Sequence, residues 1–364
     1  MLRNAALALV VLGGAAACGG DDGVEPDREA LLAAVRTVPG NPPRFAIVAL
    51  REEGSDVRVV LEAPTSNPDV LRVGFPAWTP DGRRILFSAV TAEREGRVGD
   101  DGTFTYYETD VFAISPDGGH VERLTETGDA SSAVPSPDGT TILYARREHQ
   151  DRFPPTSGLW LRDADGGNER RLLAVEDGQL DFVGGWSPDG GRIVFTRCRW
   201  IAPRPDGTIP NTCAVYTVSP ERTGLERLAE RAHGGAFSPD GKRILFVSDR
   251  DENGVHATGS DEEEFANELY VMDEDGSDQT RLTETEGLDE GFAAWRPDGE
   301  RIVYAREGPR RFATQLMVAN SDGSCPTRIA GDADFSAGAS PERPQFDEPA
   351  WRSGRSMNPP LDCS

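Results

Sequence analysis

The chain has 364 residues, which is long for one domain but within the range of all-β folds. Its 40 glycines and 27 prolines predict many short strands that are joined by tight turns. The formal net charge of −24 argues against nucleic acid as a partner and against direct binding to anionic lipid headgroups, because like charges repel.

The first 17 residues have the order of a secretory signal peptide. Arg3 precedes an apolar run, and small residues then lead to Cys18. The segment GGAAAC resembles the lipobox of bacterial lipoproteins, in which the peptide is cut before a cysteine that becomes lipidated. We therefore expect residues 1–17 to be removed and Cys18 to carry the only membrane anchor. The alternative is an ordinary secretory signal in which Cys18 is incidental.

Residues 18–44 are predicted to form a flexible tether, with a folded domain from residue 45 to 364. The stretch PDREALLAAVRTV within the tether predicts a short helix. Gly19 follows Cys18, and by resemblance to the sorting rules of Gram-negative lipoproteins this favours the outer membrane. We expect the domain to lie at the periplasmic face of that membrane or at the cell surface.

A hairpin around a Pro-Asp-Gly turn recurs five times, and the aspartates of successive turns lie 51 to 58 residues apart. Proline fixes φ for the turn, aspartate suits the next position, and glycine adopts the positive φ that reverses the chain. The five copies, which define the first to fifth repeats, are PAWTPDGRRILFSA from Pro76, AVPSPDGTTILYAR from Ala133, GGWSPDGGRIVFTR from Gly184, GAFSPDGKRILFVS from Gly235 and AAWRPDGERIVYAR from Ala293.

Each copy is followed by a second hairpin, so that two hairpins make a four-stranded antiparallel unit. Such units in tandem at about 50 residues predict a β-propeller. The segment from Phe45 is a further second hairpin, and FDEPAWRSG from Phe346 is part of a further first hairpin. We expect these halves to form one blade, with the N-terminal strands outside and the C-terminal strand inside, which closes a ring of six blades.

The repeats resemble those of the TolB-like six-bladed propellers of bacterial envelopes. The motifs that carry the resemblance are WSPDG…RIVF and ILFVSDRD…NELYVMDEDGSDQTRLTE, and it extends over about residues 45 to 352. It implies the propeller fold. It implies less about function, because propellers support unrelated activities.

The two ends of such a ring differ. The short Pro-Asp-Gly turns lie at one end, which we call the turn end, and long connections lie at the other, the long-loop end, where binding sites are common. Five polar residues where inner strands begin are predicted to form a rim at the channel mouth on the long-loop end: Asp129, Asp181, His233, Glu290 and Asp347. Convergent carboxylates favour a cationic partner or a metal ion. The alternative is a solvated acidic rim.

One stretch, DRDENG, resembles a calcium loop, with Asp249, Asp251 and Asn253 at alternate positions. The twelfth position is Ser260 and not glutamate, and no helices are predicted on either side. We therefore expect no cofactor and leave calcium at this loop as the alternative.

Four cysteines remain besides Cys18, an even number that suits disulfides in an exported protein. In the predicted propeller Cys198 and Cys213 lie together near the long-loop end, and Cys325 and Cys363 lie together near the turn end. We expect these two pairs to form disulfides, with free thiols as the alternative.

No catalytic motif is evident. Ser187 in GGWSPDGG has counterparts in the other copies, one of which is Arg296, so it is interpreted as a turn residue and not as a nucleophile. We expect a monomeric propeller that binds a protein or glycan of the envelope and is not an enzyme. The alternatives are a lyase or hydrolase with carboxylates at the channel mouth, and a structural envelope protein without a specific ligand.

The predicted anchor leads to a direct test. Cys18→Ala is expected to release the protein from membranes, because the acyl chains that hold it would no longer be attached. Membrane fractionation of cells that express either form measures this. Retention of the Cys18→Ala protein in the membrane fraction would contradict the lipoprotein prediction.

Overall fold

The structure is a computed structural model in which part of the chain is described. The described residues are 31–38, 44–51, 53–63, 70–98, 102–148, 156–200, 212–252, 255–257, 263–285, 287–307, 314–331 and 346–351. These residues form strands and turns and contain no helix, so the all-β prediction is confirmed for them. A helix that could cross a membrane is accordingly absent from the described residues.

Four sheets have four antiparallel strands each. The first contains β26 (Phe346–Trp351), β1 (Leu31–Val38), β2 (Arg44–Arg51) and β3 (Arg58–Ala63). The second contains β4 (Arg72–Trp78), β5 (Ile85–Val98), β6 (Gly102–Ile114) and β7 (Glu122–Arg123). The third contains β16 (Ala232–Phe237), β17 (Arg243–Ser248), β20 (Glu268–Asp273) and β21 (Thr280–Arg281). The fourth contains β22 (Asp289–Trp295), β23 (Arg301–Glu307), β24 (Thr314–Asn320) and β25 (Thr327–Gly331).

The second and third repeats form one eight-stranded sheet. Its strands are β8 (Ala130–Pro135), β9 (Thr141–Glu148), β10 (Thr156–Asp163), β11 (Arg170–Arg171), β12 (Gln179–Trp186), β13 (Ile193–Arg199), β14 (Ala214–Val218) and β15 (Glu226–Glu230). A single parallel pair, Ser157 with Leu180, joins the two halves. The Ser157 hydroxyl also binds the backbone of Asp181, with 3.1 Å to its N and 3.1 Å to its O. A short ribbon of β18 (Val255–Ala257) and β19 (Glu263–Phe265) stands apart.

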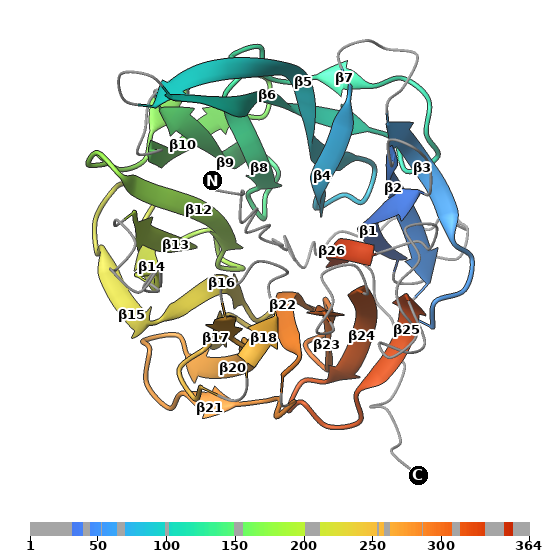
Figure 1. The fold of residues 1–364 in the computed structure, drawn as a ribbon, viewed down its shortest axis with the longest axis vertical. Coiled ribbons are helices and arrows are strands. Elements are labelled where there is room, and N and C mark those ends of the chain that lie inside the picture. Colours follow the sequence, from blue (N-terminus) through green and yellow to red (C-terminus); the bar gives the residue numbers. More distant parts are fainter. Residues whose placement is uncertain are drawn as a thin grey trace.

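The sheets are arranged around a common centre, as in a β-propeller (Figure 1). The innermost strands contact one another in sequence: β4 with β8, β8 with β12, β12 with β16, β16 with β22, β22 with β26, and β26 with β4. The hydrogen-bonded sheets do not themselves give the predicted six separate blades, because β8 to β15 are counted as one sheet through the Ser157 pair.

Strand β1 corrects two predictions. Residues 31–38 form neither a helix nor a flexible tether; they lie between β26 and β2, with Leu32 opposite Trp351 and Val35 opposite Ile47. Ala33 and Ala34 are completely buried. The leucine and alanine content favours a helix in isolation, but pairing with two strands and burial on both faces outweigh that weak preference.

The core of the described residues divides into six apolar clusters, each shared by two neighbouring four-stranded groups. In one of them, Trp295 and Tyr304 of the fifth repeat pack with Leu245 and Leu269 of the fourth. The aromatic residue at the end of the inner strand thus joins one group to the next. Middle strands such as β17 and β23 bury both faces in this way, which explains their nearly continuous apolar runs.

The repeated turns share one hydrogen-bonding pattern. In the third repeat the Ser187 hydroxyl donates to Asp189 Oδ1 at 2.5 Å and accepts from the Arg192 N–H at 2.8 Å. Asp189 Oδ1 also accepts from Gly191 N at 2.9 Å, and Gly190 has a φ of 72°. Thr79, Ser136 and Ser238 make the same two hydroxyl contacts in their own turns. The hydroxyl of Ser187 therefore stabilises the turn.

The burial of β1 leads to a prediction. Ala34→Asp places an unpaired carboxylate in the core and is expected to lower the free energy of unfolding by roughly 3 kcal/mol or more. Val59→Asp, on the exposed side of β3 where Val59 is 48% exposed, is the matched control and is expected to change little. Urea denaturation followed by circular dichroism compares the two. Equal stability of both variants would mean that β1 does not belong to the sheet.

Candidate functional site

The predicted rim residues lie at the beginnings of inner strands. Asp129 directly precedes β8. Asp181, His233 and Glu290 lie within the first three residues of β12, β16 and β22. Asp347 lies in β26, and its side chain is outside the described part of the structure. These positions lie at the long-loop end, and the side chains of Asp129, Asp181, His233 and Glu290 each have their own partners.

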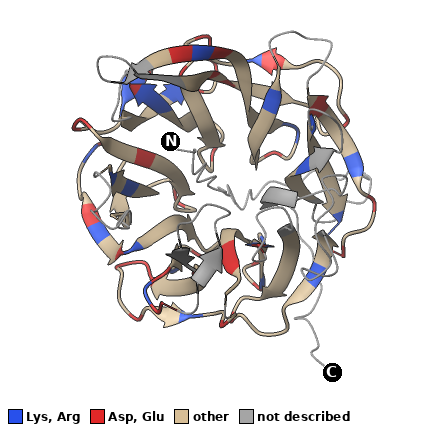
Figure 2. Cartoon of the chain, in the orientation of Figure 1, with Lys and Arg blue, Asp and Glu red and all other residues tan. Residues whose placement is uncertain are grey.

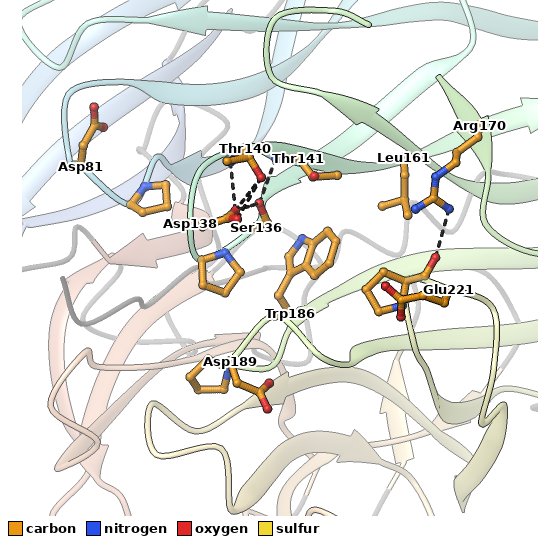
Figure 3. A pocket seen from close by; sticks show the side chains of 15 residues that line it. Asp81, Ser136, Asp138, Thr140, Thr141, Leu161, Arg170, Trp186, Asp189 and Glu221 are labelled. Carbon is orange, nitrogen blue, oxygen red and sulfur yellow. Dashed lines mark hydrogen bonds between the residues drawn. The ribbon is translucent and has the colours of Figure 1, made fainter. Parts of the chain in front are cut away.

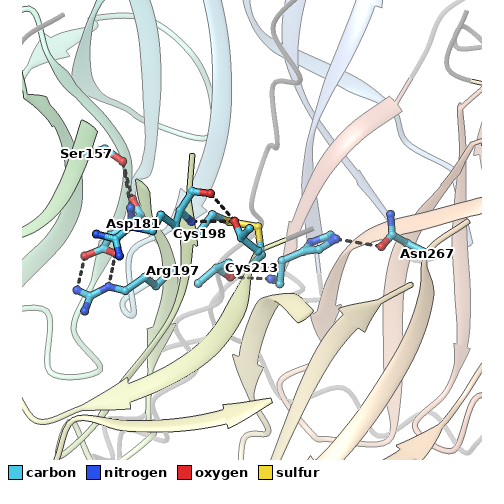
Figure 4. Close-up of a disulfide and its surroundings, with 11 residues drawn as sticks. Ser157, Asp181, Arg197, Cys198, Cys213 and Asn267 are labelled. Carbon is cyan, nitrogen blue, oxygen red and sulfur yellow. Dashed lines mark hydrogen bonds and ion pairs between the residues drawn. A yellow bond between two sulfur atoms is a disulfide. The ribbon is translucent and has the colours of Figure 1, made fainter. Parts of the chain in front are cut away.

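Asp181 is held by an arginine of the neighbouring strand (Figure 4). Its Oδ1 lies 2.7 Å from Arg197 Nε and its Oδ2 lies 2.8 Å from Arg197 Nη2. The Asp181 side chain is fully buried, and this burial raises its pKa while the Arg197 guanidinium opposes the rise. The pair neutralises its own charge, so Asp181 is not an open ligand for a cation.

Two further rim carboxylates are also paired with an arginine. Glu290 Oε1 accepts from Arg306 Nε at 2.8 Å, and burial raises the pKa of Glu290. Asp129 accepts from Arg146 Nε at 3.0 Å and Nη2 at 2.9 Å. Each arginine comes from the second strand of the same repeat, directly opposite or beside the carboxylate. The sequence did not reveal these partners, because each arginine is 16 or 17 residues from its carboxylate and only the pairing of the two strands brings them together.

His233 is part of a short polar chain. Its Nε2 lies 3.2 Å from Asn267 Oδ1, and Asn267 Nδ2 donates to Asp289 Oδ1 at 2.8 Å. Burial lowers the pKa of His233, and the hydrogen bond with Asn267 opposes this. His233 is therefore neutral at physiological pH and links the fourth repeat to the fifth.

The residues of the predicted calcium loop are also engaged. Asp249 Oδ1 lies 3.1 Å from Arg231 Nε, and Asp251 Oδ2 lies 3.2 Å from Arg281 Nη1. Asn253 lies outside the described residues. Across the described part of the chain, no three histidine, cysteine or acidic side chains come together in a way that would hold a metal ion.

The disulfide predicted between Cys198 and Cys213 is formed, with an S–S distance of 1.99 Å (Figure 4). It links the end of β13 to the residue before β14. Cys325 is also disulfide-bonded, and the predicted partner Cys363 lies outside the described residues.

A pocket of 690 Å³ opens at the turn end, opposite the predicted rim (Figure 3). The turns of the first three repeats form most of its wall, and the second hairpins of the second and third repeats complete it. Its lining residues are Pro80, Asp81, Ser136, Pro137, Asp138, Thr140, Thr141, Leu161, Arg170, Trp186, Pro188, Asp189, Gly190, Pro220 and Glu221. The sequence analysis placed the candidate binding surface at the other end and missed this pocket.

The pocket combines apolar walls with carboxylates. Trp186, Leu161 and four prolines supply the apolar surface, and four acidic side chains line it against one arginine. Hydrogen bonds from Ser136 and Ser187 lower the pKa of Asp138 and Asp189, which keeps both carboxylates ionised at neutral pH. Around the rest of the ring both signs of charge are distributed among the repeats (Figure 2). The pocket is therefore an anionic recess suited to a cationic group.

The chain was compared with known proteins. No protein-family model matches it. An uncharacterised protein of Agrobacterium fabrum is 25% identical over 309 residues, which cover 75% of this chain and 96% of that relative. The Tol-Pal system protein TolB of Anaeromyxobacter dehalogenans is 30% identical over 135 residues, or 36% of this chain and 26% of that relative. The crystal structure of TolB from Acinetobacter baumannii has a TM-score of 0.60 at 18% identity, covering 89% of this chain and 67% of that chain.

The fold is that of a TolB-like β-propeller. The predicted fold resemblance is thereby confirmed at the level of the propeller. The sequence match spans about a quarter of the Anaeromyxobacter TolB, so the activity and partners of that protein are not transferred by it. The TolB-like fold thus supplies a scaffold, and the pocket at its turn end is the candidate site.

The buried ion pair at the rim leads to a prediction. Asp181→Ala leaves the Arg197 guanidinium unpaired and is expected to lower the free energy of unfolding by roughly 3–5 kcal/mol. Asp117→Ala, at an exposed ion pair with Arg58, is the control and is expected to have little effect. Thermal unfolding measures both. A fully stable Asp181→Ala protein would show that this carboxylate is not needed for the fold.

Proposed function

We propose that this chain is an exported protein of the cell envelope, anchored through a lipid on Cys18, whose propeller binds a protein partner. A glycan is the alternative ligand. The observation that carries the proposal is the anionic pocket at the turn end, a recess of 690 Å³ with apolar walls. A preformed concave site with a few polar groups is the usual form of a binding site on a rigid scaffold.

The pocket favours binding over catalysis. Its described lining contains no histidine or cysteine. The one serine in it, Ser136, donates to Asp138 at 2.6 Å and accepts from Thr141 N at 2.9 Å, so its hydroxyl is committed to the turn. A lyase or hydrolase at the channel mouth is disfavoured as well, because Asp181 and Glu290 are each held by an arginine.

The comparisons support a protein ligand. The relative in Anaeromyxobacter dehalogenans is named as a Tol-Pal system protein, and that name refers to a system of proteins. The exported location is supported by the disulfide between Cys198 and Cys213, because disulfides persist in oxidising compartments outside the cytosol. The lipobox-like segment supports a lipid anchor, at the periplasmic face of the outer membrane or at the cell surface.

We further propose a closed ring of six blades that acts as a monomer. The six apolar clusters support six blades, since each cluster lies between two neighbouring four-stranded groups of the described residues. The pairing of β1 with β26 supports closure, because it joins the two ends of the described chain in one sheet. Among the described residues four large apolar side chains are exposed, in or next to β3, β4 and β15: Val57, Val59, Leu71 and Leu225. This scattered exposure is usual for a monomer.

Site-directed crosslinking in cells tests the proposed function. A photoreactive amino acid replaces exposed Glu221 at the pocket in one variant and exposed Val59 on β3 in the control. Capture of a reproducible protein from the pocket position, but not from the control position, is expected by mass spectrometry. Failure to capture any protein specific to Glu221 would contradict the proposal. Capture of a saccharide there would favour the glycan alternative over a protein.

A further inference from the structure

The pocket lies where other repeats place an arginine of their own. The residue two positions after the turn glycine is arginine in four repeats and Thr141 in the second; the arginines are Arg84, Arg192, Arg243 and Arg301. The backbone N–H of Thr141 donates to the turn hydroxyl of Ser136 at 2.9 Å. Arg192 and Arg243 make the same bond, to Ser187 at 2.8 Å and to Ser238 at 3.0 Å. Thr141 therefore occupies the same structural position as these arginines.

The arginine at this position bridges to the next repeat. Arg192 Cζ lies 5.2 Å from the centre of the Phe237 ring, and Arg192 Nη1 donates to the carbonyl of Glu274 at 3.2 Å. Arg243 Cζ lies 4.9 Å from the centre of the Trp295 ring. A guanidinium over an aromatic face is attracted by the negative charge density of the ring. We call the boundary between two successive repeats a seam. At two successive seams the guanidinium of one repeat thus lies over an aromatic ring of the next.

Trp186 is the matching ring at the seam between the second and third repeats. Its Nε1 donates to the carbonyl of Val134 at 3.4 Å, as Trp295 Nε1 donates to Ala236 at 3.1 Å, so the two indoles are placed alike. Trp186 is 6% exposed and Trp295 1%. No cation lies over the Trp186 ring among the described residues, because the position that would supply it is Thr141. Thr141 and Trp186 both line the pocket.

Arg170 fills part of this seam. It lines the pocket and its Nη1 donates to the carbonyl of Pro220 at 3.0 Å. This carbonyl corresponds to that of Glu274, which Arg192 uses in the next seam. Arg170 thus makes the carbonyl contact that corresponds to the one Arg192 makes in the next seam. The pocket reaches the part of Trp186 that remains exposed, and the carboxylates of Asp138 and Asp189 line the same pocket.

We propose that the pocket binds an arginine side chain of the partner protein, whose guanidinium lies over Trp186 as Arg192 and Arg243 lie over the rings of the next two seams. This inference rests on the proposed protein-binding function and names what the pocket recognises. Arginine fits better than lysine, because a planar guanidinium stacks on an aromatic face and donates to several acceptors at once. The pocket volume of 690 Å³ leaves room for the residues on either side of that arginine.

A capped five-residue peptide with one central arginine is the probe, and the same peptide with neutral citrulline is its control. NMR follows the indole N–H signal of Trp186, which is assigned by its loss in Trp186→Phe. We expect the arginine peptide to shift this signal saturably and to bind at least about tenfold more tightly than the citrulline peptide, since cation–π attraction is lost in the latter. Equal affinity for both peptides would overturn the proposal.

Thr141→Arg is the decisive variant. It introduces the residue that four other repeats already carry at this position, so it is expected to fold and to raise the unfolding temperature. Its own guanidinium should lie over Trp186 and reduce peptide affinity at least about tenfold, while Val59→Arg, which adds an arginine on the exposed side of β3 away from the pocket, should leave affinity unchanged. Undiminished peptide binding by a folded Thr141→Arg protein would contradict the inference.

The crosslinking experiment separates the two proposals. Thr141→Arg combined with the photoreactive residue at position 221 is expected to lose the captured partner. Undiminished capture by this variant would reject the arginine pocket and leave the protein-binding function standing. Absence of a captured protein even with Thr141 intact would reject the protein-binding function itself.

Discussion

The hydrogen-bonded turn between the first two strands of each repeat is the interaction on which the rest of the structure depends. In four of the five repeats a serine or threonine hydroxyl binds the turn aspartate and the N–H of the residue two positions after the turn glycine, as Ser187 does with Asp189 and Arg192. This hydrogen bond places the residue two positions after the turn glycine at the seam between repeats. Arg192 and Arg243 at this position lie over an aromatic ring of the next repeat, whereas the second repeat has Thr141 there and a pocket beside it. One local turn thus decides both the repeat geometry and the location of the pocket.

Buried charge explains why the inner strands do not form an acidic site. Removing a carboxylate from water costs several kcal/mol unless an opposite charge and hydrogen bonds compensate. Asp181 and Glu290 meet this requirement through Arg197 and Arg306 of the adjacent strand. Their negative charge is used within the fold and is not available to a ligand. At the turn end, by contrast, Asp138 and Asp189 are stabilised by neutral hydroxyl and backbone donors, so their charge remains for a cationic partner.

Much of the fold and little of the site was predictable. The Pro-Asp-Gly turns, the paired hairpins and the Cys198–Cys213 disulfide follow from turn chemistry and repeat spacing. Strand β1 was missed because Leu32 to Ala34 have the composition of a helix, and only their place between β2 and β26 makes them a strand. The pocket was missed although the sequence has threonine at position 141, where four other repeats have arginine. This difference indicates a pocket only when Trp186 is known to lie in the same wall.

The sequence by itself determined the turns, the strands that follow them and the repeated unit, because these depend on residues within a few positions of one another. Only the tertiary structure decided which charges are neutralised and where a recess remains. Asp181 and Arg197 lie on adjacent strands, Leu32 pairs with Trp351, and the pocket takes its walls from three successive repeats. Distances between such segments depend on how the sheets pack around the centre, and no local propensity or spacing encodes them.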